Sequence, residues 1–229
     1  MTHPSVAGLP SRWSRDVARA AGPDAVIDAS VVDAVWAEVA ARYGEPHRRY
    51  HTLDHVAAVL DTIDELLNDE AVRRDVPDAD AVVLAGWLHD VIYDPIRHDN
   101  EERSAVWAQE RLTKIGVPAA TVDEVRRLIV LTAGHEVEAT DVAGAVLVDA
   151  DLAILGAPPT HYDRYAAAIR AEYDHVPDDA YETGRSAVLQ SFLERVRLFH
   201  TDAVHDGRDA TARSNLAREI AGLRRVAAP

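Results

Sequence analysis

The sequence predicts an all-α fold: a single compact domain of roughly nine helices. Apolar residues recur with a period near 3.6 along most of the chain, whereas the alternation typical of half-buried strands is nearly absent. No internal repeat or low-complexity tract divides the 229 residues, and the connections between periodic segments are short. We therefore expect residues 30–226 to form the helical domain, with the last helices packed on it. Residues 1–29 are expected to be an N-terminal extension.

The first three predicted helices are located by their ends and their apolar faces. Residues 30–43 place four large apolar side chains on one stripe, and Gly44 ends the pattern. Thr52 is a typical N-cap for a second helix, which carries His55 on its apolar face. Residues 78–91 are apolar on nearly every side, which is typical of a helix buried at the centre of a fold.

Six more helices are predicted after these. Residues 99–115 form one, ended by Gly116. Thr121 and Glu124 have the spacing of a capping box, which predicts a helix over residues 121–133. The remaining helices are predicted at residues 140–155, 160–174, 178–199 and 209–226.

Composition and charge exclude several classes of function. The chain has 24 Lys and Arg against 39 Asp and Glu, a net charge of −15, without a dense basic run. Duplex nucleic acid and anionic membranes are therefore not expected partners. A small phosphorylated substrate is compatible if a metal ion supplies positive charge, and a homo-oligomer is equally compatible.

Compartment and redox chemistry follow from what the sequence does not contain. No apolar run approaches the roughly 18 residues of a membrane span, and the first residues do not resemble a secretory signal. A cytoplasmic location is therefore expected. The absence of cysteine excludes disulfides, thiolate metal sites and a cysteine nucleophile.

Three places in the sequence contain ionisable side chains whose burial costs free energy. His51 and His55 are four residues apart, but no Glu follows His51, which excludes the HExxH zinc-protease motif. His89 and Asp90 end the most apolar helix, where a metal ion would neutralise them. A structural role, with Asp90 bound to backbone groups or to an arginine, is about equally compatible with this pair.

The third place is the pair Asp149 and Asp151 within an apolar helical pattern. Residues two apart on a helix point about 200° from each other, so only one of them can face a given site. Three helices bearing His, His-Asp and Asp would form a mixed nitrogen and oxygen site. Such a site suits a divalent metal: Mn, Fe, Zn, Mg or Co.

The order of these residues resembles the HD superfamily of metal-dependent phosphohydrolases. More narrowly, several motifs are similar to an uncharacterised bacterial branch identified as predicted HD phosphohydrolases, over roughly residues 30 to 225. These motifs are RRYHTLDH (48–55), WLHDVIYD (87–94), DNEERSA (99–105), LTAGH (131–135), DADLAILG (149–156), IRAEY (169–173), GRSAVLQSFLERVRLF (184–199) and ARSNL (212–216).

The resemblance implies an HD-type fold and a set of metal ligands. It points to His55, His89 and Asp90, with Asp151 favoured as the last ligand and Asp149 as the alternative. The implied reaction is hydrolysis of a phosphate ester or anhydride, with nucleotides among the candidates, by metal-activated water. Asp90, paired with His89, would be catalytic by orienting that water.

Further residues are candidates for substrate binding, each with a structural alternative. His51 and His135 could bind phosphate, hold a second metal or orient the ligands. Arg49 could clamp a phosphate, and Tyr93 and Asn100 could form the rim of the pocket.

Two other functions remain open from the sequence. The first is an iron oxygenase of related helical fold, with His51 and His135 as extra ligands. The second is a non-catalytic ligand-binding protein that keeps the metal for stability; a closed coordination sphere would favour it.

Overall fold

A computed structural model describes residues 4–226 of the chain, and the side chains of residues 6–223. The described part contains eleven α-helices and two short 3₁₀ helices, without a strand, which confirms the prediction of an all-α fold. In chain order these are η1 (Pro4–Gly8), α1 (Leu9–Ala21), α2 (Ala29–Tyr43), α3 (Leu53–Leu67), α4 (Glu70–Asp75), α5 (Ala79–Leu88), α6 (Asn100–Ile115), α7 (Ala119–Leu131), α8 (Val142–Leu152), η2 (Ala153–Gly156), α9 (Pro159–Glu172), α10 (Asp178–Glu194) and α11 (Asp202–Val226).

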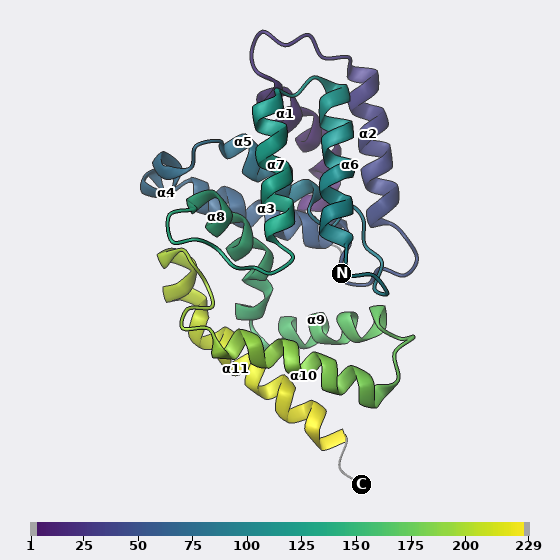
Figure 1. Cartoon of the computed structure of the whole chain (residues 1–229), viewed down its shortest axis with the longest axis vertical. Helices are drawn as coiled ribbons and strands as arrows, with labels where there is room; N and C mark the ends of the chain where they lie inside the picture. Colours follow the sequence, from purple (N-terminus) through teal and green to yellow (C-terminus); the bar gives the residue numbers. More distant parts are fainter. Residues whose placement is uncertain (1–3, 227–229) are drawn as a thin grey trace.

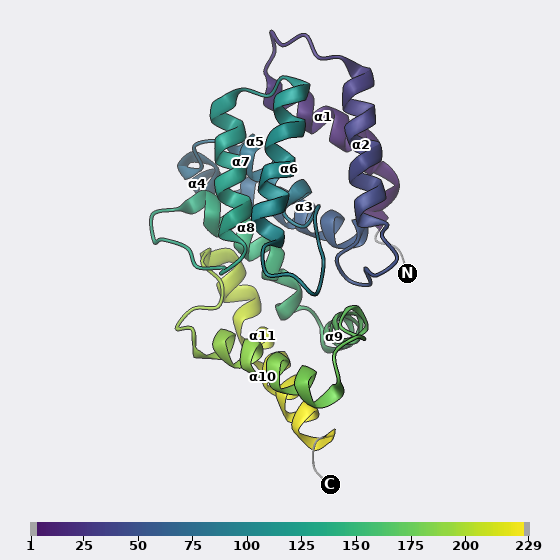
Figure 2. The ribbon, with the colours of Figure 1, turned by 45° about the vertical axis from the view of Figure 1, so that its right-hand side comes forward.

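The helices form two parts, one above the other in Figure 1. Helices α1 to α8 make the larger part, and α9, α10 and α11 lie together below it in Figure 1. The apolar helix α5 lies at the centre of the larger part, as its composition predicts, and contacts α1, α3, α7 and α8. In the smaller part, α11 packs against η2 and α10. Figure 2 shows the two parts from a second side.

The N-terminal region adds a helix to the core that the sequence analysis did not assign. Leu9, Trp13 and Val17 on α1 are fully buried, and their four-residue spacing is a helical signal that the many charged neighbours obscured. The ring of Trp13 packs edge-on against that of Trp87 on α5. Residues 9–21 are therefore part of the helical core, whereas residues 1–29 had been expected to be an extension.

Several predicted helix ends differ from the observed ones. The capping box at Thr121 does not form, because α7 begins two residues earlier, directly after Pro118, whose φ of −55° suits a helix entrance. The most apolar helix ends at Leu88 rather than near residue 91, because the chain turns at His89 and Asp90. The short helix α4 was not predicted, and α11 begins seven residues earlier than predicted.

No single helix within residues 4–226 has the length and apolar character to cross a membrane, although the bent pair of residues 142–156 and 159–172 together meets that test by length and composition alone.

Close packing of α5 on α3 depends on Gly86. A Cβ at this position would lie 2.6 Å from Cδ1 of Ile63 on α3. We expect Gly86→Ala to lower the free energy of unfolding by about 1–3 kcal/mol, because the added methyl group must displace the fully buried side chain of Ile63. Chemical denaturation would measure this loss. Gly184→Ala is the matched control, since a Cβ there meets nothing within 4 Å; equal effects of both substitutions would contradict the close contact.

Candidate metal centre

Three helices of the larger part bring four predicted side chains to one place. His55 lies in the first turn of α3, which Thr52 caps as predicted by accepting a hydrogen bond from the Asp54 N–H. His89 and Asp90 follow the last residue of α5, and Asp151 lies in the last turn of α8. Helices α3, α5 and α8 contact one another pairwise, so their polar residues meet inside an apolar body.

The donor atoms of these side chains form a tight cluster. Nε2 of His55 and Nε2 of His89 lie 3.1 Å apart. Asp90 Oδ2 lies 3.1 Å from His89 Nε2 and 3.6 Å from His55 Nε2. Asp151 Oδ1 lies 3.3 Å from His55 Nε2 and 3.6 Å from His89 Nε2. We refer to these four residues as the metal centre, because their donor atoms suit a cation.

Both the spacing and the chemistry of these donors fit a divalent cation. Ligand atoms about 2.1 Å from a common ion, at angles of about 90–110°, lie about 3.0–3.5 Å apart, close to the observed separations. His55, His89 and Asp151 alone already meet the geometry of a metal-binding group. Two imidazole nitrogens that face each other at 3.1 Å repel unless a proton or a cation lies between them.

The orientation of His89 favours metal binding. Its Nδ1 lies 3.1 Å from the carbonyl oxygen of Gly86, to which it can only donate. Nδ1 therefore carries a hydrogen, and in the neutral ring the lone pair is on Nε2, which faces the centre. This second hydrogen bond is the usual support of a metal-bound histidine.

The metal-free centre has strongly shifted ionisation. Burial disfavours the charged form of His89, but Asp90 and Asp151 outweigh it and raise its pKa well above the usual range. The same balance raises the pKa of His55. Burial also disfavours the charged carboxylates, yet the pKa of Asp90 is held well below its usual range by His89, and that of Asp151 by hydrogen bonds from His135 and His55.

These shifts predict how metal affinity depends on pH. A cation competes with protons for the two imidazoles, whose pKa values are raised, so affinity is expected to rise with pH and to keep rising above pH 6.5, the ordinary histidine pKa. Calorimetric titration with Zn²⁺ or Mn²⁺ between pH 6 and 9, in buffers of different ionisation enthalpy, would count the released protons. An affinity that levels off below pH 6.5 would contradict the raised histidine pKa values.

Of the two acids on α8, only Asp151 faces the metal centre. Asp149 is fully buried on the opposite side of the helix, where its Oδ1 accepts from the His200 N–H and its Oδ2 from the N–H and hydroxyl of Thr201. Asp149 thus holds the chain just before α11. The alternative ligand assignment to Asp149 is corrected, because the 200° offset that separates the two acids turns it away.

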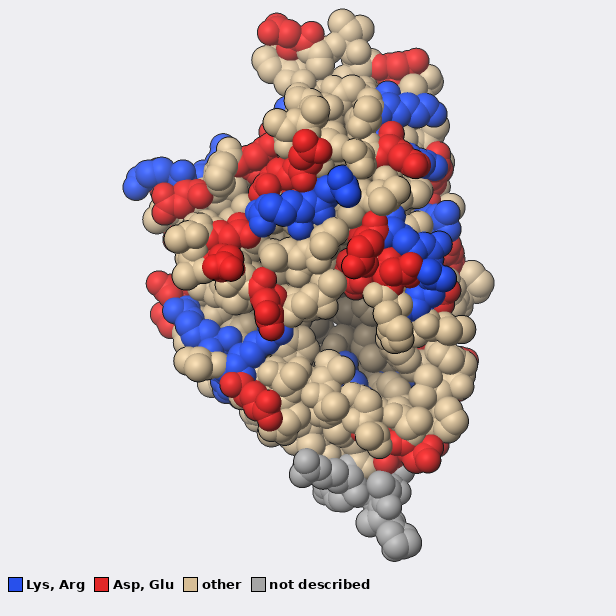
Figure 3. Space-filling model, in the orientation of Figure 1, with Lys and Arg blue, Asp and Glu red and all other residues tan. Residues whose placement is uncertain are grey.

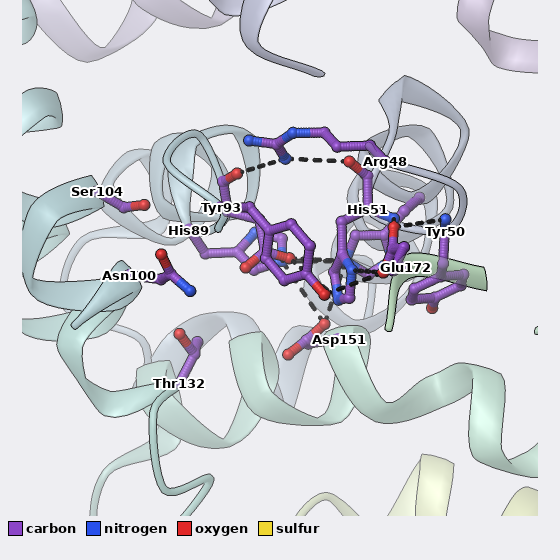
Figure 4. A network of polar contacts seen from close by, with 12 residues as sticks. Arg48, Tyr50, His51, His89, Tyr93, Asn100, Ser104, Thr132, Asp151 and Glu172 are labelled. Atoms are coloured by element: carbon purple, nitrogen blue, oxygen red, sulfur yellow. Dashed lines mark hydrogen bonds and ion pairs between the residues drawn. The ribbon is translucent and has the colours of Figure 1, made fainter. Parts of the chain in front are cut away.

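Two predicted substrate-binding residues lie away from the metal centre. The Arg49 guanidinium donates to the carbonyls of Pro46 and Arg48 and lines a neighbouring cavity of about 630 Å³. Asn100 lies to one side of the polar network (Figure 4). It is buried, and its side-chain amide accepts from the N–H of Asp94 and donates to the carbonyl of Asp94. Neither residue is brought to the metal centre: the side chain of Arg49 bonds its own turn, and that of Asn100 bonds Asp94 before α6. Their assignment to substrate binding stays a prediction.

The other three predicted residues do lie around the centre. His135 Nε2 is 2.9 Å from Asp151 Oδ2, and His51 Nε2 is 3.9 Å from Asp90 Oδ2. The hydroxyl of Tyr93 donates to Glu172 beside His51 (Figure 4). His135 thus contacts Asp151 of the metal centre directly, whereas His51 and Tyr93 lie beside the centre.

Glu172 is a functional residue that the sequence analysis missed. Its buried carboxylate lies 2.7 Å from His51 Nδ1 and accepts the backbone N–H groups of Arg49, Tyr50 and His51. Burial opposes its charge, but these donors lower its pKa to about 2. The motif IRAEY contained Glu172, yet an acid at the end of a surface helix gives no signal of burial.

A cavity of about 750 Å³ lies between the two parts of the molecule and reaches the metal centre. Figure 3 shows this side of the molecule hollowed above the lower helices. Asp90 and Asp151 line the cavity, whereas His55 and His89 are buried behind them. Six aromatic side chains also line it: Tyr50, Tyr93, Tyr165, Tyr173, Tyr181 and Phe192. Its volume is in the range of sites for small molecules.

Comparison with known proteins finds no match of this chain to a family model, to a curated protein or to a solved structure.

Proposed function

We propose that the protein is a metal-dependent phosphohydrolase that acts on a small phosphate ester or anhydride. The observation that carries the proposal is the metal centre itself: two histidines and two acids, with donor separations that suit one divalent cation, at the wall of a ligand-sized cavity. A cation held there supplies Lewis acidity and activates water for hydrolysis. The motif resemblance to the HD superfamily supports the same reaction class.

The open side of the metal centre supports catalysis rather than a purely structural role. The side chains of Asp90 and Asp151 are 14% and 15% exposed, toward the cavity, whereas His55 is 2% exposed. A structural metal site is normally closed by its protein ligands, and a catalytic site leaves a position for water or substrate. The asymmetry of exposure therefore favours an enzyme.

The contact of His135 favours one cation over a pair. Its Nε2 is engaged by Asp151, whereas a di-iron oxygenase would need His135 as a further ligand. His51 does not discriminate, because the bond of its Nδ1 to Glu172 leaves Nε2 facing Asp90 and is the usual support of a metal-bound histidine. The position of His135 therefore favours the hydrolase.

Metal analysis joined to a phosphatase screen tests the proposal. The purified protein is expected to bind about one divalent cation per chain and to hydrolyse at least one class among nucleotides, sugar phosphates and aryl phosphates. Chelation is expected to remove activity while the far-ultraviolet circular dichroism keeps its helical signal, because the core of α1 to α8 is extensive without metal. Re-addition of the cation should restore turnover.

Two results would contradict the proposal. Loss of the helical signal on chelation would make the metal structural. Two redox-active irons per chain, with oxygen consumption, would identify an oxygenase.

A further inference from the structure

We propose that the cavity binds a substrate with a second anionic group, and that Arg195 binds this group while the metal centre receives the scissile phosphate. The inference rests on the proposed function and adds to it the class of substrate: a phosphate ester whose leaving group bears another phosphate or a carboxylate.

Arg195 is fixed in place at the wall of the cavity, directly after the last residue of α10. Its Nη1 donates to the carbonyl of His135 and its Nη2 to that of Gly134, each at 2.9 Å. The guanidinium also lies over the ring of Phe192, 4.7 Å from its centroid. A guanidinium has five N–H groups, so three remain for a ligand after these two bonds.

The charge of Arg195 is not neutralised by an ion pair. The other arginine that lines the cavity, Arg185, binds Glu219 at 2.8 Å and the hydroxyl of Tyr165. By contrast, Arg195 donates to two neutral carbonyls, and no carboxylate within residues 6–223 forms an ion pair with it. Burial lowers its pKa, with the charge of Glu136 acting in the opposite direction.

An arginine without an ion-pair partner at this position can bind an anion. The chain carries a net charge of −15, which repels anions from the molecule as a whole. A half-buried guanidinium with free donors is a strong local binding group for phosphate or carboxylate, which it can hold through two parallel hydrogen bonds. The cavity therefore has a cationic position apart from the metal centre.

The two anion positions are within reach of one small molecule. A single residue, His135, links them: its carbonyl accepts from Arg195, and its ring nitrogen contacts Asp151 of the metal centre. Both Arg195 and Asp151 line the same cavity. A molecule with anionic groups at its two ends can thus contact both.

Calorimetric binding of matched probes tests the inference without requiring turnover. The probes are propyl phosphate, 3-phosphooxypropanoate and propane-1,3-diyl bisphosphate, with the ethane and butane analogues to vary the spacing. They would be titrated into the protein as purified with its metal, and into the variants Arg195→Gln and Arg195→Lys. Arg197→Gln is the matched control, because Arg197 lies two residues further on, pairs with Asp202 and does not line the cavity.

In the wild type, a second anionic group is expected to tighten binding about tenfold or more relative to propyl phosphate. Arg195→Gln should remove this gain, Arg195→Lys should keep part of it, and Arg197→Gln should keep all of it. The probe with the larger gain identifies the second anion as phosphate or carboxylate.

Two outcomes would overturn the inference: equal affinities of the wild type for probes with one and two anions, or a gain that persists in Arg195→Gln. If Arg195→Gln also loses propyl phosphate, its loop has been disturbed and Arg195→Lys decides: it must retain part of the gain. Failure of the proposed function is separate, because it appears as absence of hydrolysis whatever the probes show.

Discussion

Asp90→Asn is expected to reduce hydrolysis at least about 100-fold while leaving the fold intact. The carboxylate of Asp90 lies 3.1 Å from His89 Nε2 and 3.6 Å from His55 Nε2, where it completes the donor set on the cavity side. Asn keeps the volume of the side chain but removes the charge that binds the cation and orients water. Turnover on the best substrate of the screen, bound metal per chain and melting temperature would be measured together.

The control for this substitution is Asp99→Asn. Asp99 is half exposed and pairs with Arg97 in a loop outside the cavity. It should keep turnover and metal content near those of the wild type. Near-normal turnover of Asp90→Asn would remove Asp90 from the mechanism and would leave the hydrolase proposal without its central residue.

Glu172→Ala is expected to lower the free energy of unfolding by about 3–5 kcal/mol, the largest stability effect that we expect. The substitution leaves three partly buried backbone N–H groups at residues 49–51 without their shared acceptor. It also removes the partner of His51 Nδ1 and of the Tyr93 hydroxyl. Chemical denaturation at pH 7 would measure the loss. The control is Glu182→Ala on the next helix, α10, because Glu182 is partly exposed to solvent.

Glu172 is also expected to make the free energy of unfolding depend on pH in the acid range. The pKa of Glu172 is lowered to about 2 in the folded chain, against an ordinary value of 4.5. A lowered folded pKa means that the stabilisation is complete above about pH 4.5 and is lost as pH falls toward 2. The contribution is about 3 kcal/mol. Wild-type stability should therefore fall more steeply than that of Glu172→Gln over this range; parallel curves would contradict the assignment.

Much of the fold was readable from local patterns. The apolar period of 3.6, the Thr52 cap and the glycines that end α2 and α6 placed those helices to within one or two residues. The nearly uniform apolar surface of residues 79–88 identified the central helix. These features are local, because a cap or an apolar stripe acts on neighbours within one turn or one face. The misplaced start of α7 shows that limit, since two competing starts lay within three residues.

The candidate site, like the fold, could be predicted from the sequence only in part. The sequence by itself determined that ionisable residues occur at the ends of apolar helices, and that burial of His89, Asp90 and an acid on α8 would require a compensating charge. It also determined that only one of Asp149 and Asp151 could face a given point. It could not determine which, because that depends on the rotation of α8 against its neighbours.

Only the tertiary structure decided that Asp151 rather than Asp149 joins His55 and His89, that Arg49 and Asn100 lie away from this cluster, and that Glu172 and Arg195 contact His51 and His135. Glu172 is 121 residues from His51 in sequence, and Arg195 is 60 residues from His135. The physical reason is that a charged residue on a helix surface has the same neighbours in sequence whether its side chain contacts water or a buried partner. Its burial, its pKa and its hydrogen bonds are fixed only when the smaller part of the molecule packs over the cavity.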